Sequence, residues 1–208
     1  NRQKDTNSLN LAYDGTETIT QGPLIKVISN PLTVAQMEEF SVSMWVKILN
    51  KSTAVEPLVN LTITNSDHFN ASYHSTEDIG FTYEIGGVAV RYTGTTSNLL
   101  TEDTWKNVIF VCKWSESTAA DRVKLYIDGK FRTWNTGETQ NWTTTSPAND
   151  GTMWIGCESG TGRKLDGQID DVLVYTDALS DGLTSPSDAD VAKEEIARIY
   201  NAGKRSHR

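Results

Sequence analysis

Two adjacent carboxylates, Asp170 and Asp171, lie inside the apolar run QIDDVLVY of residues 168–175. In an extended chain side chains alternate between two faces, so Asp170 would share a face with Val172 and Val174. A buried carboxylate is costly unless a cation, a metal ion or several N–H donors lie beside it. The pattern therefore indicates either a structural carboxylate held by N–H groups or an Arg, or a calcium ligand.

Aromatic residues in polar, turn-rich segments form a second group that could bind a ligand. Trp134 and Trp142 lie in the polar segment of residues 132–150, and Tyr73 and His74 lie in another, DHFNASYHST. An exposed ring can stack on the apolar face of a sugar while neighbouring Asn, Asp and Thr side chains donate and accept hydrogen bonds. The alternative is that each ring folds back and packs beneath its own loop. Three other tryptophans lie in or beside apolar runs and are expected to pack: Trp45, Trp105 and Trp154.

Short β-type runs separated by clusters of Gly, Asn, Asp and Ser occur along most of the chain. Their turn signals recur roughly every 8–12 residues, which is typical of a β-sandwich or barrel of about ten strands. The length fits one domain spanning residues 1–208. The predicted strands are residues 8–15, 24–29, 40–49, 57–64, 80–87, 88–93, 107–114, 122–131, 153–157 and 168–175.

Two dipeptides between β-type runs predict tight hairpins. They are Asp128-Gly129 in YIDGKF and Gly86-Gly87 in EIGGVAV. Antiparallel neighbours joined by two-residue turns cannot build a parallel sheet, so a nucleotide-binding α/β fold is excluded.

A short helix is predicted at the C-terminus, where it should pack against the sandwich. Asp188 or Asp190 would cap its start, and Gly203 would end it in a left-handed conformation. Its expected apolar face consists of Val191, Ala192, Ile196, Ile199 and Tyr200.

Composition limits the partners. The chain has 19 Lys and Arg against 27 Asp and Glu, a formal net charge of −8, which disfavours nucleic acid and anionic membranes. No apolar stretch approaches the roughly 20 residues of a membrane helix, so no membrane insertion is predicted. The lack of a signal peptide and of an initial Met is typical of a processed chain or an excised domain.

The two cysteines, Cys112 and Cys157, both fall in apolar runs and form no C-x-x-C pair. Two buried free thiols and one cross-link between them both remain open at this point.

Several motifs follow one another in an order that is specific to one family. They are LNLAYDGT, FSVSMWVKI, TWKNVIFVCKW with VKLYIDGK, GQIDDVLVYTDALS and EEIARIYNAG. This order resembles the laminin G-like, concanavalin A-like lectin and glucanase domains, with pentraxin-like features. The resemblance implies an all-β, two-sheet antiparallel jelly-roll sandwich with one short C-terminal helix.

Two positions differ from the pentraxin pattern. Met44 stands where pentraxins have the disulfide partner of the residue that matches Cys112. Residues 156–160, GCESG, stand where pentraxins have a Gly-Gln-Glu-Gln-Asp calcium-binding run, and Glu158 is the residue retained. The broader laminin G-like group therefore describes the chain better than the pentraxin branch.

The resemblance also implies one structural calcium ion, bound by carboxylate, amide and carbonyl oxygens. In such modules the Asp-Gly of the first strand can lie near the last strand, which would bring Asp14 toward Asp170 or Asp171. A second candidate site in the pentraxin manner consists of Asn65, Asp67 and Glu158.

Catalysis is not indicated. Glycosidases need two carboxylates across the scissile bond, and the Glu-x-Asp-x-x-Glu run of the related glucanases does not occur here. The three histidines adjoin no nucleophile-elbow sequence. We expect a non-catalytic, lectin-like carbohydrate-binding module of a secreted or surface-displayed protein, alone or as part of a larger multidomain or oligomeric assembly. The alternative is a structural or adhesion domain of a surface or virion protein that binds protein.

Overall fold

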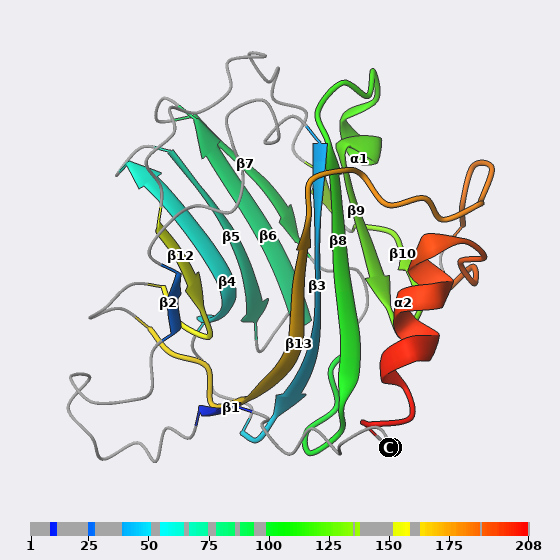
Figure 1. Ribbon diagram of the computed structural model, residues 1–208. Helices are drawn as coiled ribbons and strands as arrows, with labels where there is room; N and C mark the ends of the chain where they lie inside the picture. The colour runs from blue at the N-terminus through cyan, green and yellow to red at the C-terminus, as the bar shows by residue number, and fades with distance from the viewer. Residues whose placement is uncertain are drawn as a thin grey trace.

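The computed structural model describes residues 9–11, 25–27, 39–50, 55–64, 67–74, 78–85, 88–93, 99–134, 136–137, 152–158, 163–187 and 189–207. The strands in these residues form two antiparallel sheets packed in two layers (Figure 1). One sheet has six described strands in the order β1-β13-β3-β8-β9-β10, and the other has seven in the order β11-β7-β6-β5-β4-β12-β2. This arrangement confirms the predicted fold class.

The elements have the following bounds. The six-stranded sheet contains β1 (Leu9–Leu11), β13 (Gly167–Tyr175), β3 (Glu39–Ile48), β8 (Lys106–Lys113), β9 (Val123–Ile127) and β10 (Lys130–Arg132). The seven-stranded sheet contains β11 (Thr136–Gly137), β7 (Val88–Thr93), β6 (Asp78–Ile85), β5 (Asp67–His74), β4 (Val55–Thr64), β12 (Thr152–Ile155) and β2 (Ile25–Val27). The described helices are α1 (Ala119–Arg122) and α2 (Glu195–Gly203).

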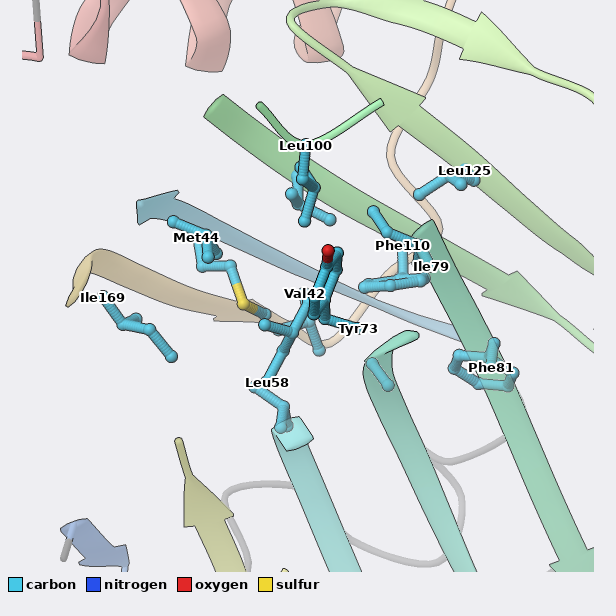
Figure 2. Close-up of a cluster of buried hydrophobic side chains, with 14 of the residues drawn as sticks. Val42, Met44, Leu58, Tyr73, Ile79, Phe81, Leu100, Phe110, Leu125 and Ile169 are labelled. Carbon is cyan, nitrogen blue, oxygen red and sulfur yellow. The ribbon is translucent and has the colours of Figure 1, made fainter. Parts of the chain in front are cut away.

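The core between the sheets is lined by alternate residues of the strands. Along β3, Val42 and Met44 point into the core, whereas Trp45 is buried on the opposite face, where it stacks on α2. Figure 2 shows apolar side chains from both sheets meeting in this core. The rings of Phe81 and Phe110 link the two layers, with centroids 5.6 Å apart.

A second apolar cluster lies on the outer side of the six-stranded sheet, where α2 covers β8, β9 and β10 (Figure 1). Its buried members are Ile109, Val111, Tyr126, Phe131, Ala192 and Ile196. The Tyr126 hydroxyl donates a hydrogen bond to the Asp181 carboxylate. Burial, together with this carboxylate, raises the pKa of Tyr126. The segment before α2 is thereby fixed to the sheet through both apolar and polar contacts.

The turn between β9 and β10 forms as predicted. Asp128 and Gly129 have φ angles of 53° and 73°, the left-handed conformation that a two-residue hairpin turn of this kind requires. The Asp128 carboxylate accepts hydrogen bonds from Lys106 Nζ at 2.8 Å and from the Asn107 backbone N–H at 3.1 Å. The turn is thus tied to the start of β8.

Strand β13 contains a bulge that the alternation argument does not anticipate. Asp170 pairs with Trp45 and Leu173 with Ser43, so β13 has one extra residue between these two pairs. Asp171 occupies the irregularity with a φ of 48°. The prediction that Asp170 shares a face with Val172 and Val174 is therefore wrong.

The bulge changes which residues face the core. Ile169 before it and both Val172 and Val174 after it contact the inter-sheet core. Asp170 instead points to the outer face, beside Trp45, and Leu173 on the same side is 45% exposed. The carboxylate is thus never required to enter the core between the sheets.

Helix α2 forms where a helix is predicted, but its ends differ from the prediction. Glu194 precedes it without a side-chain cap, and the Asp190 carboxylate instead accepts a hydrogen bond from Ser187 N, while Asp188 lies outside the described residues. Gly203 is helical rather than left-handed, and it packs closely on β3, since a Cβ there would collide with Trp45 Nε1. Val191, expected on the apolar face, is 60% exposed.

Strand β5 falls where the sequence pattern indicates a polar loop. Its outward positions are polar, so only Phe69, Ala71 and Tyr73 carry the strand signal, and these three are buried in the core. β6 and β7 pair as the second predicted hairpin requires, although its turn, residues 86–87, lies outside the described residues.

Both cysteines are free and buried in the structure. Of the two alternatives left open by the sequence, the structure has the unpaired thiols.

Candidate functional site

A row of residues in cross-strand register runs across the seven-stranded sheet. From β12 to β6 its members are Trp154, Asn60, Asn70 and Thr82, which we call the cross-strand row. Met153, Phe69 and Phe81 adjoin row members along their strands and are buried in the core, so alternation places the row on the outer face. At roughly 4.8 Å between strands, the row extends over about 14 Å from β12 to β6.

The members of the cross-strand row combine an indole, two amides and a hydroxyl. Trp154, Asn70 and Thr82 are half-buried, so each keeps part of its surface in solvent. Asn60 is buried, and its Nδ2 donates a hydrogen bond to the Glu158 carbonyl at 2.7 Å. Oδ1 of Asn70 is itself buried and has no hydrogen-bond partner among the described residues. Because an unpaired buried acceptor is costly, this atom suits a buried water molecule rather than a ligand that approaches from solvent.

His74 lies on the same outer face, four residues along β5 from Asn70. Its ring covers Gly80, since a Cβ at Gly80 would meet His74 Nε2 at 2.6 Å. The Ser72 hydroxyl lies 2.9 Å from the same nitrogen. Of the two residues predicted from this segment, His74 is therefore near a face that a ligand can approach.

Tyr73 points the other way and has 0% exposure. Figure 2 shows its ring among the core side chains. A fully buried ring cannot contact a ligand, so the prediction that Tyr73 binds one is wrong. The strand alternation of β5, absent from the sequence interpretation, separates Tyr73 from His74.

Trp134 occupies a packing position. Its ring is partly buried against the inter-sheet core, and its indole N–H donates to the Val123 carbonyl at 2.7 Å. This environment matches the alternative stated for the ring rather than an exposed platform. Trp142, the other predicted platform, lies outside the described residues.

Asp170 is compensated by a histidine that sequence analysis did not select. His207 Nε2 lies 3.1 Å from Asp170 Oδ2, and the Asp171 N–H donates to Asp170 Oδ1 at 2.8 Å. Asp171 itself is exposed, and Asp14 lies outside the described residues. Nothing in the tripeptide Ser-His-Arg marks His207 as a partner, because the contact depends on the path of the chain after α2.

The second candidate metal site is represented by one described side chain. The Glu158 carboxylate lies 3.7 Å from Arg163 Nε, a guanidinium that competes with a bound cation. Asp67 begins β5 opposite Thr64, and Asn65 lies outside the described residues. Across the part of the chain that the structure describes, no three His, Cys, Asp or Glu residues gather in a way that could hold a metal ion.

Neither described thiol is suited to nucleophilic chemistry. Burial raises the pKa of Cys157 to about 11, against a smaller opposite effect of Lys164, and burial also raises the pKa of Cys112. Both thiols therefore stay protonated at neutral pH. No helix in the described residues is long and apolar enough to cross a membrane.

Comparison with known proteins gives one family. Residues 24–182 match a laminin G-like family model described as the concanavalin A-like lectin/glucanases superfamily. No curated protein sequence matches the chain.

Many solved structures share the fold at low sequence identity. The binding domain of botulinum neurotoxin DC in complex with SialylT superposes with a TM-score of 0.60 and 16% identity over 87% of this chain and 40% of that chain. Domains LG4-5 of the mouse laminin alpha1 chain give 0.57 and 11% over 78% and 42%. Domain 4 of AbnA, an extracellular arabinanase from Geobacillus stearothermophilus, in complex with arabinotriose gives 0.51 and 19% over 69% and 63%. The chain thus spans about two fifths of the toxin and laminin chains.

Proposed function

The chain belongs to the concanavalin A-like lectin/glucanases superfamily, and from this premise we propose that it is a non-catalytic, lectin-like carbohydrate-binding module. The observation that carries the proposal is the cross-strand row on the outer face of the seven-stranded sheet. An indole at one end followed by amide and hydroxyl groups suits a sugar, which offers apolar ring faces and many hydroxyls.

The dimensions of the row favour an oligosaccharide over a single sugar. Trp154, Asn70 and Thr82 lie on three strands, with Asn60 between the first two, so a ligand that touches all of them crosses several strands. Two solved relatives in the fold were obtained with SialylT and with arabinotriose, which supports a glycan as the class of ligand.

The described carboxylates support a non-catalytic role. Asp170 is bonded to His207 and to a backbone N–H, and Glu158 lies beside Arg163. Neither forms the pair of facing carboxylates that glycoside hydrolysis uses. The fold occurs in binding domains and also in a domain of an arabinanase, so the fold alone does not decide this point.

We further propose that the module is extracellular or displayed on a surface, as a free domain or part of a larger assembly. Calcium stays a prediction, at Asp14 with Asp170 or Asp171 and at the second candidate site of Asn65, Asp67 and Glu158. Both Asp170 oxygens lie beside protein donors, which disfavours Asp170 among these ligands.

The direct test is a glycan array probed with the wild-type chain and with Trp154→Ala, Asn70→Ala and Leu173→Ala. We expect the first two changes to weaken binding to the recognised glycans by about 10-fold to 100-fold, since central contacts contribute roughly 1–3 kcal/mol. Leu173→Ala, an exposed control on the six-stranded sheet, should bind as wild type. An array without any recognised glycan, or equal binding by all four proteins, would contradict the proposal and favour a protein-binding domain.

A further inference from the structure

Asn-x-Ser/Thr tripeptides occur at four positions of the chain: Asn50, Asn60, Asn70 and Asn141. This tripeptide, the sequon, is the acceptor motif for N-linked glycans in secreted proteins, and the modified asparagine lies on the surface because the attached sugar is bulky and hydrated. The sequence gives all four positions the same standing. The fold decides which asparagine has room for a glycan, and Asn50, Asn60 and Asn70 lie within the described residues.

The sequon at Asn60 has no room for a sugar. Asn60 is 4% exposed in the middle of β4, with β5 paired on one side of it and β12 on the other. Its Nδ2, the atom to which a glycan is attached, donates a hydrogen bond to the Glu158 carbonyl at 2.7 Å. A sugar on this nitrogen would need space that the closely packed chain already fills, so a glycan at Asn60 is incompatible with the fold.

The sequon at Asn70 is held within a paired strand. Asn70 is half-buried in β5, between Asn60 on β4 and Thr82 on β6, and its Oδ1 is buried. The hydroxyl of this sequon belongs to Ser72, which is 3% exposed and whose Oγ lies 2.9 Å from His74 Nε2. Both side chains that define the motif are thus engaged in the packing of the strand rather than presented to solvent.

The sequon at Asn50 starts just beyond the end of β3, which closes at Ile48. The Ile48 carbonyl accepts a hydrogen bond from the Asp103 N–H at 2.8 Å. The Leu49 N–H donates to the Asp166 carbonyl at 2.9 Å, so the strand end is fixed on two sides. Asn50 follows in a bend of the backbone and is exposed. The fold therefore holds this side chain in solvent, where an attached sugar meets no packed neighbour strand.

We propose that Asn50 is an N-glycosylation site and that the fold excludes glycans from Asn60 and Asn70. The inference rests on the extracellular setting proposed above. The sugar donor is an oligosaccharide carried on a lipid pyrophosphate. Asn50 Nδ2 forms a bond to the anomeric carbon of that oligosaccharide, and the bond from this carbon to the pyrophosphate oxygen breaks. The lipid pyrophosphate leaves with the electron pair, and Nδ2 loses one proton.

The position of Asn50 is compatible with ligand binding at the cross-strand row. Asn50 follows a strand of the six-stranded sheet, whereas the row lies on the outer face of the seven-stranded sheet. A glycan at Asn70 would instead stand within the row, beside Asn60 and Thr82. Modification at Asn50 alone therefore leaves the proposed ligand face uncovered.

The test is secretion of the full chain from insect cells behind an added secretion signal, followed by glycopeptide mass spectrometry. We expect a glycan on Asn50 and unmodified Asn60 and Asn70. Asn50→Gln and Ser52→Ala should each abolish the modification, and Ser52→Thr, which keeps the hydroxyl, should retain it. Folded secreted protein with unmodified Asn50, or with Asn60 or Asn70 modified to the same extent, would overturn the proposal. The readout is a peptide mass, so it stays decisive even if no glycan ligand is found for the cross-strand row.

A second variant tests whether the fold, rather than the local sequence, excludes Asn60. Phe110→Asp places a carboxylate in the inter-sheet core, where Phe110 is 1% exposed, and should keep the full chain unfolded inside the cells. In this unfolded chain we expect Asn60 to become modified, with Asn50 modified as before. The matched control adds Thr62→Ala, which removes the Asn60 sequon and should prevent the new modification. Unmodified Asn60 in the unfolded chain would show that the local sequence excludes it and would count against selection by the fold.

Discussion

The two sheets share one core but differ in what lies on their outer faces. The six-stranded sheet carries Ile109, Val111 and Tyr126 on its outer side, and these are sealed by α2 and the preceding segment. On the seven-stranded sheet the described outer positions are polar or amphipathic, and Asn70, Thr82 and Trp154 are half-buried. No described helix lies over those positions.

This difference separates two tasks within one sandwich. The face covered by α2 is a second core and contributes to stability, so substitutions there should lower the free energy of unfolding. The face with the cross-strand row contributes little to packing, so changes there should act on ligand binding. The following predictions test that separation.

The largest effect is expected from Ile196→Ala. Ile196 has 0% exposure and joins α2 to the outer side of the six-stranded sheet, so its truncation should lower the free energy of unfolding by about 2–5 kcal/mol. Thr82→Ala, on the other face, should cost less than about 0.5 kcal/mol. Urea unfolding of both variants measures the contrast, and equal losses would refute the assignment of the two faces.

A smaller loss is expected from Gly203→Ala. The added Cβ would collide with Trp45 Nε1 and lie 2.8 Å from its Cε2, so the helix and the ring must separate. Overpacking of this kind costs about 1–3 kcal/mol. The melting temperature should fall while glycan binding by the cross-strand row is retained. Wild-type stability in this variant would show that the end of α2 adjusts freely.

Trp134 allows its hydrogen bond to be tested apart from its bulk. Trp134→Phe keeps an aromatic ring but loses the indole N–H that donates to Val123 O, which should cost about 1 kcal/mol. Folded protein of this variant and of Trp134→Ala should bind glycan with the affinity of wild type, even though both variants are less stable. A selective loss of binding with unchanged stability would restore Trp134 as a ligand platform.

The smallest effect concerns calcium. Because both Asp170 oxygens accept hydrogen bonds from protein groups, metal-stripped wild type and Asp170→Asn should show the same shift in melting temperature on addition of calcium. A shift in wild type that Asp170→Asn removes would return Asp170 to the predicted calcium site. Thermal scans with chelator and with millimolar calcium distinguish the two results.

Features encoded by local sequence were predictable. The Asp128-Gly129 turn follows from two residues that tolerate left-handed conformations, and α2 follows from the spacing of Ile196, Ile199 and Tyr200. Period-two alternation located most strands. These signals need no knowledge of what lies across the core.

Features that depend on distant contacts were not predictable. The bulge at Asp171 is set by pairing with β3, and His207 meets Asp170 across 37 positions of sequence. The cross-strand row needs the register of four strands at once, since most of its members are separated by long segments of chain. Sequence analysis therefore selected none of its members, and it expected Trp154 to pack in an apolar run, whereas the structure leaves Trp154 half-buried on the outer face.

The bulge in β13 decides which way the second half of the strand faces. Deleting Asp171 would remove the extra residue, so Val172 would follow Asp170 directly and pair opposite Met44 in a regular ladder. Ile169, Val172 and Val174 would still face the core, and Asp170 and Leu173 would still face outward. A single codon deletion at this point would therefore preserve the pattern of inward and outward positions, whereas a strand that kept Asp171 but lost the bulge would turn Val172 and Val174 to the outer face.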